Sequence, residues 1–229
     1  MGYNDNYSFS WFGGEVLPGF YRSCQIGVRI LLLLLTRCQL KGKENVPARG
    51  PLLIVSNHIN LTDPIIIGAV IDQKVAFMAK EGLFRFKFSR FFMRNLGAFP
   101  VHRGRMDVEA LRQALQVMAE GKALVMFPEG SRSRNSQLQS ALLGSALIAS
   151  RSGALILPIG ISGTENIKGV AWLLHRPRIT VNIGCPFSLP PVDGRLTKEK
   201  RAELTRSIMS RIADLLSPEY HGDYAERGN

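Results

Sequence analysis

Short apolar runs alternate along the chain with longer segments in which apolar residues recur every three or four positions. Short runs bounded by Gly, Pro or polar residues are typical of buried strands, and the sequence predicts five of them, at 52–55, 75–79, 123–127, 155–162 and 178–183. The longer segments predict helices at 83–94, 107–121, 138–151 and from Thr197 onward. Strands that alternate with helices predict an α/β fold, with a mostly parallel central sheet flanked by helices.

The first predicted strand ends in a polar corner. Ser56, Asn57 and His58 follow its last apolar residue. Asp63 and Pro64 then suit the start of a helix, where Asp caps the end and the missing N–H of Pro costs nothing. Side chains beyond the carboxyl ends of parallel strands converge on ligands, so His58 and Asp63 suit a dyad in which a carboxylate orients a proton-accepting imidazole. The alternative makes Asp63 a plain helix cap and His58 a hydrogen-bonded loop residue.

A second corner follows the predicted strand at 123–127. Gly130 permits positive φ, so that successive backbone N–H groups can form a cup for an anion. Arg132 and Arg134 add charges that match a phosphate. Glu129 has the wrong sign to hold phosphate, and we expect it to orient an arginine or to accept a hydrogen bond from a substrate hydroxyl. The alternative is an ordinary surface turn, which uses the same residue types.

Residues 16–40 are strongly apolar but are interrupted by Arg22, Arg29 and Arg37. The uninterrupted apolar run at 30–35 is far shorter than the roughly 20 residues that span a bilayer, and aromatic residues of the kind that settle at headgroup level precede it. We expect a membrane-interface anchor that dips into one leaflet while the arginines reach lipid phosphates. The alternatives are a helix packed on the protein's own core and a spanning helix in which Arg29 is paired.

The totals narrow the function classes. The chain has 229 residues, enough for one domain with a core and a small appendage, and we expect a helical membrane-interface segment at 1–40, a main domain at 41–216 and a loose polar tail at 217–229. Hydrophobic residues make up 45%, which excludes a disordered protein. The net charge of +11 favours a polyanion: nucleic acid, an anionic membrane or a phosphorylated substrate.

Cysteine and histidine spacing bears on metals and compartment. The three cysteines form no CxxC pair, so a disulfide framework or structural zinc is not expected, and a reducing, cytosol-facing location fits best. The four histidines show no HExxH and no ligand cluster, so we expect no metal. Five Phe interleave with cations at 83–94, where they suit base stacking, insertion into lipid, or a core. No recognised nucleic-acid motif accompanies them, so we expect no nucleic-acid partner.

Four blocks in order resemble the glycerolipid acyltransferase family over roughly residues 40–190. They are Asn57-His58 to Asp63, in the pattern NHxxxxD; Gly97-Ala98-Phe99-Pro100-Val101-His102-Arg103; Phe127-Pro128-Glu129-Gly130-Ser131-Arg132-Ser133; and Ile156-Leu157-Pro158-Ile159-Gly160. The segment from Ala79 to Phe84 resembles the part of the family between the first two blocks. Two departures are visible, because His102 stands where Asp is frequent and Ser131 where Thr is commoner.

The resemblance implies roles for the residues that match. His58 would be the general base on the acceptor hydroxyl, and Asp63 its orienting partner. The implied substrate-binding residues are Asn57, Lys80, Arg103, Glu129, Gly130, Ser131, Arg132 and Pro158. Most of these would receive the acceptor's phosphate and glycerol, whereas Pro158 would shape the acyl-donor side.

The resemblance also implies a reaction. A fatty acyl group would pass from a thioester, acyl-CoA or acyl carrier protein, to the sn-2 hydroxyl of 1-acyl-glycerol-3-phosphate, giving phosphatidic acid without a cofactor. The absence of a G-x-S-x-G elbow argues against a serine acyl-enzyme. The expected partners are thus a lyso-phospholipid, a thioester donor and an anionic membrane surface, with the protein peripheral or monotopic on the cytoplasmic face. The alternatives are acylation of glycerol-3-phosphate or another lyso-lipid and, in another class, a non-enzymatic basic membrane-surface or nucleic-acid-binding adaptor.

Overall fold

Seven strands form one sheet in the order β1-β7-β6-β2-β5-β3-β4 in the computed structural model, which describes residues 19–102, 107–190 and 196–225. The strands are β1 (Arg37–Lys41), β2 (Leu52–Ser56), β3 (Val75–Lys80), β4 (Ala98–Val101), β5 (Ala123–Met126), β6 (Leu155–Ser162) and β7 (Arg178–Ile183). Neighbouring strands are parallel except for β6 and β7. The predicted α/β fold with a mostly parallel sheet is confirmed.

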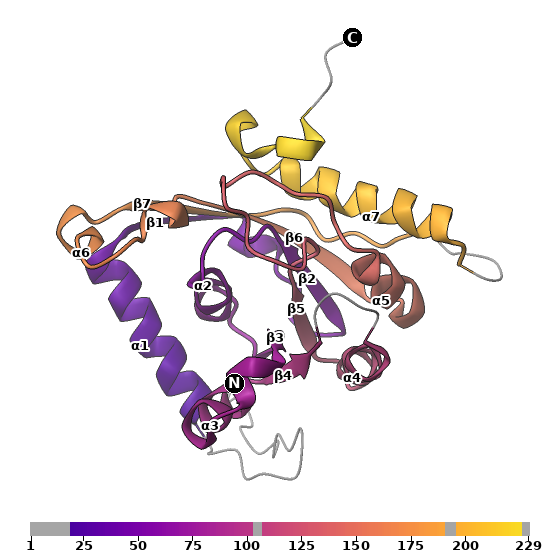
Figure 1. The fold of residues 1–229 in the computed structure, drawn as a ribbon, viewed down its shortest axis with the longest axis horizontal. Coiled ribbons are helices and arrows are strands. Elements are labelled where there is room, and N and C mark those ends of the chain that lie inside the picture. Colours follow the sequence, from indigo (N-terminus) through magenta and orange to yellow (C-terminus); the bar gives the residue numbers. More distant parts are fainter. Residues whose placement is uncertain (1–18, 103–106, 191–195, 226–229) are drawn as a thin grey trace.

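Helices cover both faces of this sheet (Figure 1). They are α1 (Phe20–Leu35), α2 (Asp63–Val70), α3 (Lys87–Asn95), α4 (Val108–Ala119), α5 (Gly144–Ser152), α6 (Trp172–His175) and α7 (Lys198–Ala213). All five residues of β2 are buried, and they alternate between two cores. Leu53 and Val55 pack with residues of α4, α5 and α7, whereas Leu52 and Ile54 pack with residues of α2. Burial on both faces explains why this strand is apolar from Leu52 to Val55.

Two predicted helix starts are confirmed. The side chain of Asp107 accepts a hydrogen bond from the N–H of Ala110, and that of Thr197 from the N–H of Lys200. The helix expected at 138–151 begins only at Gly144, because N–H groups in the preceding residues bind elsewhere. Those of Leu138, Gln139 and Leu142 donate to Tyr220, Glu129 and Pro128.

The N-terminal segment is built into the domain. α1 packs on α2, where the side-chain amide of Gln25 donates to the carbonyls of Gly68 and Ile71. The expectation that the arginines reach lipid is wrong for Arg29, which donates to the carbonyl of Ala69 and pairs with Asp72 at 2.7 Å. The boundary expected after residue 40 falls within β1, an unpredicted strand that pairs with β7. Within the described part of the chain, no helix has both the length and the apolar character to cross a membrane.

The C-terminal segment is also tied down as far as residue 225. It forms two short 3₁₀ turns, η4 (Pro218–Tyr220) and η5 (Gly222–Tyr224). The N–H of Leu138 donates to the carbonyl of Tyr220, and the N–H of Asp223 donates back to the carbonyl of Leu138. The loose tail expected from residue 217 is therefore wrong for its described part.

Candidate active site

The two polar corners that the sequence singled out meet at one edge of the sheet. The first follows β2 and the second follows β5, and these strands are parallel neighbours, so their carboxyl ends lie side by side. The backbone N–H of His58 donates to Oε1 of Glu129 at 2.9 Å, and the N–H of Ser133 donates to the carbonyl of His58 at 2.7 Å. The second corner thus braces the backbone of the first.

His58 and Asp63 form a buried dyad. Nδ1 of His58 lies 2.9 Å from Oδ2 of Asp63, and the two residues are 6% and 0% exposed. The same carboxylate oxygen accepts the N–H groups of Ile59 and Asn60 at 2.7 Å each. Asp63 is therefore not a plain helix cap. The N-cap of α2 is Thr62, and the Asp63 carboxylate binds both the imidazole and the backbone of the loop that follows it. Since a carboxylate only accepts, Nδ1 donates, and Nε2 is left as the proton acceptor.

Phe127 holds the plane of the imidazole. Its ring stacks on that of His58 with centroids 4.2 Å apart and an angle of 23° between the planes. This contact crosses from the β5 corner to the β2 corner, so the imidazole is fixed by a carboxylate at its edge and by an aromatic ring on its face. The sequence showed Phe127 as a motif residue but gave no sign of this stacking.

Glu129 makes two backbone contacts that the sequence did not predict. Its Oε1 accepts the N–H of His58, and its Oε2 accepts the N–H of Gln139 at 3.0 Å. No arginine pairs with it among the described residues. Burial raises the pKa of Glu129 to about 7, against the lowering effect of the two backbone N–H groups, and the nearby carboxylates of Asp63 and Asp223 raise it further. Glu129 thus joins the catalytic corner to the loop that precedes α5.

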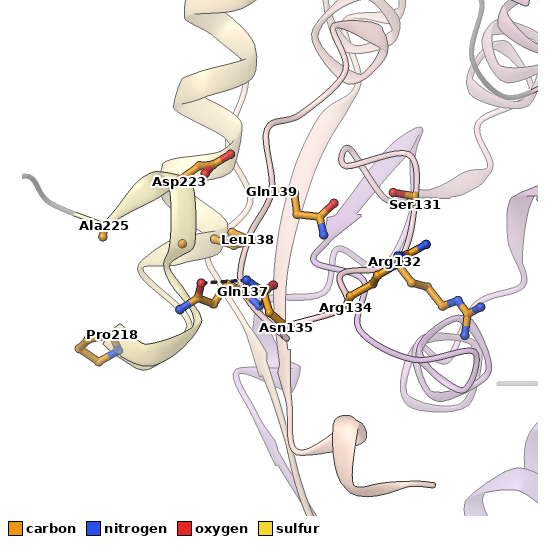
Figure 2. A pocket seen from close by; sticks show the side chains of 11 residues that line it. Ser131, Arg132, Arg134, Asn135, Gln137, Leu138, Gln139, Pro218, Asp223 and Ala225 are labelled. Carbon is orange, nitrogen blue, oxygen red and sulfur yellow. Dashed lines mark hydrogen bonds between the residues drawn. The ribbon is translucent and has the colours of Figure 1, made fainter. Parts of the chain in front are cut away.

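Gly130 takes the left-handed conformation that the sequence predicted, with φ of +70°. A Cβ at this position would also meet the flexible end of the Leu142 side chain, which would have to move. Ser131 and Arg132 follow on the exposed side of the turn and line a pocket of about 740 Å³, together with Arg134 and the C-terminal turns. The two arginine side chains extend away from those turns (Figure 2), and neither has a hydrogen bond or ion pair with a described residue.

Asn57 and Pro158 are placed within the sheet. The side-chain amide of Asn57 donates to the carbonyl of Ile161 and accepts its N–H, both at 2.8 Å. It joins the ends of β2 and β6, and its polar atoms are used in doing so. Pro158 is buried opposite Val55, and its carbonyl accepts the N–H of Gly184. Asn57 thus ties β6 to the end of β2, and Pro158 lies within β6 itself. That both residues bind substrate stays a prediction.

The remaining expected residues follow β3 and β4. Lys80 is the last residue of β3, is exposed, and lies opposite Val101 in the register. Arg103 lies outside the described residues. Before it, His102 binds carboxylates through both ring nitrogens, Nε2 to Glu81 and Nδ1 to Asp107, each at 2.9 Å.

The His102 contacts reveal a second H-x4-D pair, His102 and Asp107, with the spacing of His58 and Asp63. Burial raises the pKa of Asp107, but the N–H groups of His102 and Ala110 and the His102 ring outweigh it and lower this pKa to about 2. The sequence contained this pair, and its spacing was the signal that could have revealed it. Unlike His58, His102 keeps no ring nitrogen for a substrate, so it joins structural elements.

The part of the chain that holds both polar corners matches a known family. A family model described as Acyltransferase matches residues 37–162. A Bacillus subtilis protein named 1-acyl-sn-glycerol-3-phosphate acyltransferase is 26% identical over 85% of this chain and 96% of its own length. A Streptococcus pneumoniae protein of the same name is 30% identical over 70% of this chain and 57% of its own length. A chloroplastic relative from Arabidopsis thaliana, LPAT1, is 28% identical, and the chain spans about half its length (49%).

The fold is shared with a solved structure. The crystal structure of the 1-acyl-sn-glycerophosphate (LPA) acyltransferase PlsC from Thermotoga maritima matches with a TM-score of 0.65 and 25% sequence identity. The match covers 85% of this chain and 79% of that chain.

Proposed function

Because the chain belongs to the acyltransferase family, whose model matches more than half of its length, we propose that it acylates the sn-2 hydroxyl of 1-acyl-glycerol-3-phosphate from a thioester donor. The product is phosphatidic acid. The single observation that carries this proposal is the His58–Asp63 contact at 2.9 Å. It leaves Nε2 of His58 as a base beside a turn whose arginines pair with no residue that the structure describes. The relatives' names support the same acceptor.

In the proposed reaction, Nε2 of His58 takes the proton of the acceptor hydroxyl as its oxygen attacks the thioester carbonyl. The new C–O bond forms as the C–S bond breaks, and the imidazolium returns the proton to the leaving thiolate. Asp63 stabilises the imidazolium and fixes its orientation, and the stacked ring of Phe127 limits its rotation. No enzyme nucleophile is needed.

The acceptor phosphate is assigned to three basic residues that follow strands of the sheet or end one. Arg132 is exposed on the turn that braces His58, and Lys80 is exposed at the end of β3. Arg103 follows β4 in the sequence and belongs to the same set. Guanidinium groups match phosphate in a bidentate way, so these side chains fix the lipid's headgroup while the hydroxyl faces Nε2.

The protein is proposed to work at the membrane surface, on the cytoplasmic face. One side of α1 packs on α2, and the other presents the exposed side chains Ile26, Ile30, Leu31, Leu33 and Leu34. This amphipathic arrangement and the net charge of +11 support binding to an anionic bilayer surface. The donor is a thioester of either coenzyme A or acyl carrier protein, since both are acidic and suit a basic protein.

A thiol-release assay tests this function. The purified chain is given 1-acyl-glycerol-3-phosphate, glycerol-3-phosphate or lysophosphatidylcholine, each with acyl-CoA and with acyl carrier protein as donor. We expect release with the first acceptor to exceed that with the others for at least one donor. Faster thiol release with glycerol-3-phosphate would identify that compound as the acceptor instead. Absence of thiol release with every pair of acceptor and donor would favour a non-enzymatic adaptor.

A further inference from the structure

A second concave surface, at the carboxyl ends of β3 and β4, is lined by three arginines. This pocket has a volume of about 530 Å³ and lies between α3, Pro100 and the 3₁₀ turn η2 (Glu81–Phe84). Arg85 follows η2, whereas Arg90 and Arg94 lie on α3. Arg90 and Arg94 are four residues apart and project from one face of α3, and all three arginines line the same pocket. None of the residues at the His58 corner lines it.

The arginine pocket has little negative charge of its own. Its carboxylate, Glu81, lies 2.9 Å from Nε2 of His102. Nε of Arg90 donates to the carbonyl of Phe84 at 2.9 Å, which holds this side chain against η2. The guanidinium groups of Arg85 and Arg94 have no hydrogen bond or ion pair with any described residue. Like charges gathered in this way repel one another, and a bound phosphate would offset that repulsion while matching the planar guanidinium donors.

The surroundings of the pocket indicate where that phosphate comes from. The segment that carries the arginines also exposes Leu83, Phe86, Phe88 and Phe91, and Phe88 is 75% exposed. This segment packs against the start of α1, where the ring of Phe20 contacts the rings of Phe91 and Phe92, with centroids 6.0 and 5.6 Å apart. Figure 1 shows the start of α1 beside α3. Aromatic rings, apolar side chains and cations together are typical of a surface that lies at headgroup level.

We propose that the arginine pocket binds the phosphate of an anionic lipid headgroup in the bilayer, through arginines that are not among the groups assigned to the acceptor. A soluble phosphate compound would gain nothing from exposed Phe86 and Phe88, whereas a lipid places its phosphate beside the layer that these rings enter. The pocket and His58 lie at the same edge of the sheet, so a headgroup held here keeps the catalytic corner against the membrane. This proposal depends on the proposed function in one respect only, which is that the partner is a lipid surface.

The test is vesicle pelleting with the full chain, which requires no turnover. Vesicles are made of phosphatidylcholine alone or of phosphatidylcholine with phosphatidic acid. The variant Arg85→Gln/Arg94→Gln removes two pocket charges and keeps the bond from Arg90 to Phe84. The matched control is Arg151→Gln/Arg206→Gln, which removes two exposed charges from α5 and α7. Thermal melting of each variant shows that it is folded.

We expect the wild type and the control to prefer the anionic vesicles equally, and the pocket variant to lose about tenfold or more of that preference. All three should bind neutral vesicles alike. Equal losses in pocket and control variants would overturn the proposal, because they would show a non-specific effect of charge. The proposal would also be overturned if the wild type bound coenzyme A in the absence of vesicles and the pocket variant did not. That result would assign the pocket to a soluble donor. Absence of acyl transfer would refute the proposed function and leave these binding results standing.

Discussion

Replacing Asp63 with Asn changes the charge of the dyad and little of its shape. In the structure one oxygen, Oδ2, accepts the imidazole N–H of His58 and two backbone N–H groups, whereas Oδ1 is buried without a partner. An Asn oxygen can take the place of Oδ2 and keep all three contacts. Its NH2 group then occupies the site of Oδ1, where a buried donor without an acceptor costs about 1–3 kcal/mol of stability.

The larger effect of Asp63→Asn is expected in the rate. A neutral amide does not stabilise the imidazolium that forms when His58 takes the proton, and we expect kcat to fall by about 10²- to 10⁴-fold. That loss is equivalent to about 3–5 kcal/mol of activation free energy. Thiol release measures kcat, and circular dichroism at the assay temperature shows that the variant is folded.

The control for Asp63→Asn is Asp72→Asn, the same chemical change at an exposed carboxylate that pairs with Arg29 and Lys43 away from the dyad. We expect its kcat to stay near the wild-type value. A folded Asp63→Asn enzyme with kcat within about threefold of wild type would refute the orienting role. An equal loss in the two variants would refute it as well, since it would show a general effect of removing a carboxylate.

Three further predictions concern the neighbouring turn. Burial raises the folded-state pKa of Glu129 from 4.5 to about 7, so the stability that this group contributes is fully present below pH 4.5 and is lost as the pH rises from there through 7, by up to about 3 kcal/mol. Denaturant unfolding at several pH values should show this fall in unfolding free energy in the wild type and not in Glu129→Gln. An equal fall in both proteins would contradict the prediction. Gly130→Ala should lower the unfolding free energy more than Gly121→Ala. Both glycines have positive φ, but only at Gly130 does the Leu142 side chain occupy the place of the Cβ. Equal losses would contradict the prediction, because they would show that Leu142 moves aside at no cost. Arg132→Gln should raise KM for 1-acyl-glycerol-3-phosphate about tenfold or more with kcat little changed. Monoacylglycerol lacks the phosphate, so an equal rise in its KM would exclude a contact between Arg132 and the phosphate.

Local patterns predicted the parts of the site that neighbouring residues determine. The apolar run that became β2 and the polar corner after it are adjacent in sequence, so composition and turn residues sufficed to place His58 at a strand end. The left-handed conformation of Gly130 was predictable for the same reason, because it depends on the backbone of one turn. Helix caps at Asp107 and Thr197 are local too.

Long-range contacts account for what the sequence did not reveal. β1 has an exposed, mixed sequence without a strand pattern, and its pairing with β7 joins residues about 140 positions apart. In a helix that began at residue 138, the N–H of Leu142 would donate to the carbonyl of Leu138. It donates to the carbonyl of Pro128 instead, and this delays the start of α5. The stacking of Phe127 on His58 likewise depends on the neighbouring positions of β2 and β5, which no local pattern encodes.

The most direct test of the account is the turnover of His58→Ala in the thiol-release assay with 1-acyl-glycerol-3-phosphate. The matched control is His175→Ala, at an exposed histidine on α6. A general base is worth about 10²- to 10⁴-fold in rate, so kcat of the folded His58→Ala enzyme should fall by at least that much while the control keeps wild-type turnover. Turnover of His58→Ala within a few-fold of wild type would contradict the central claim that this imidazole deprotonates the acceptor.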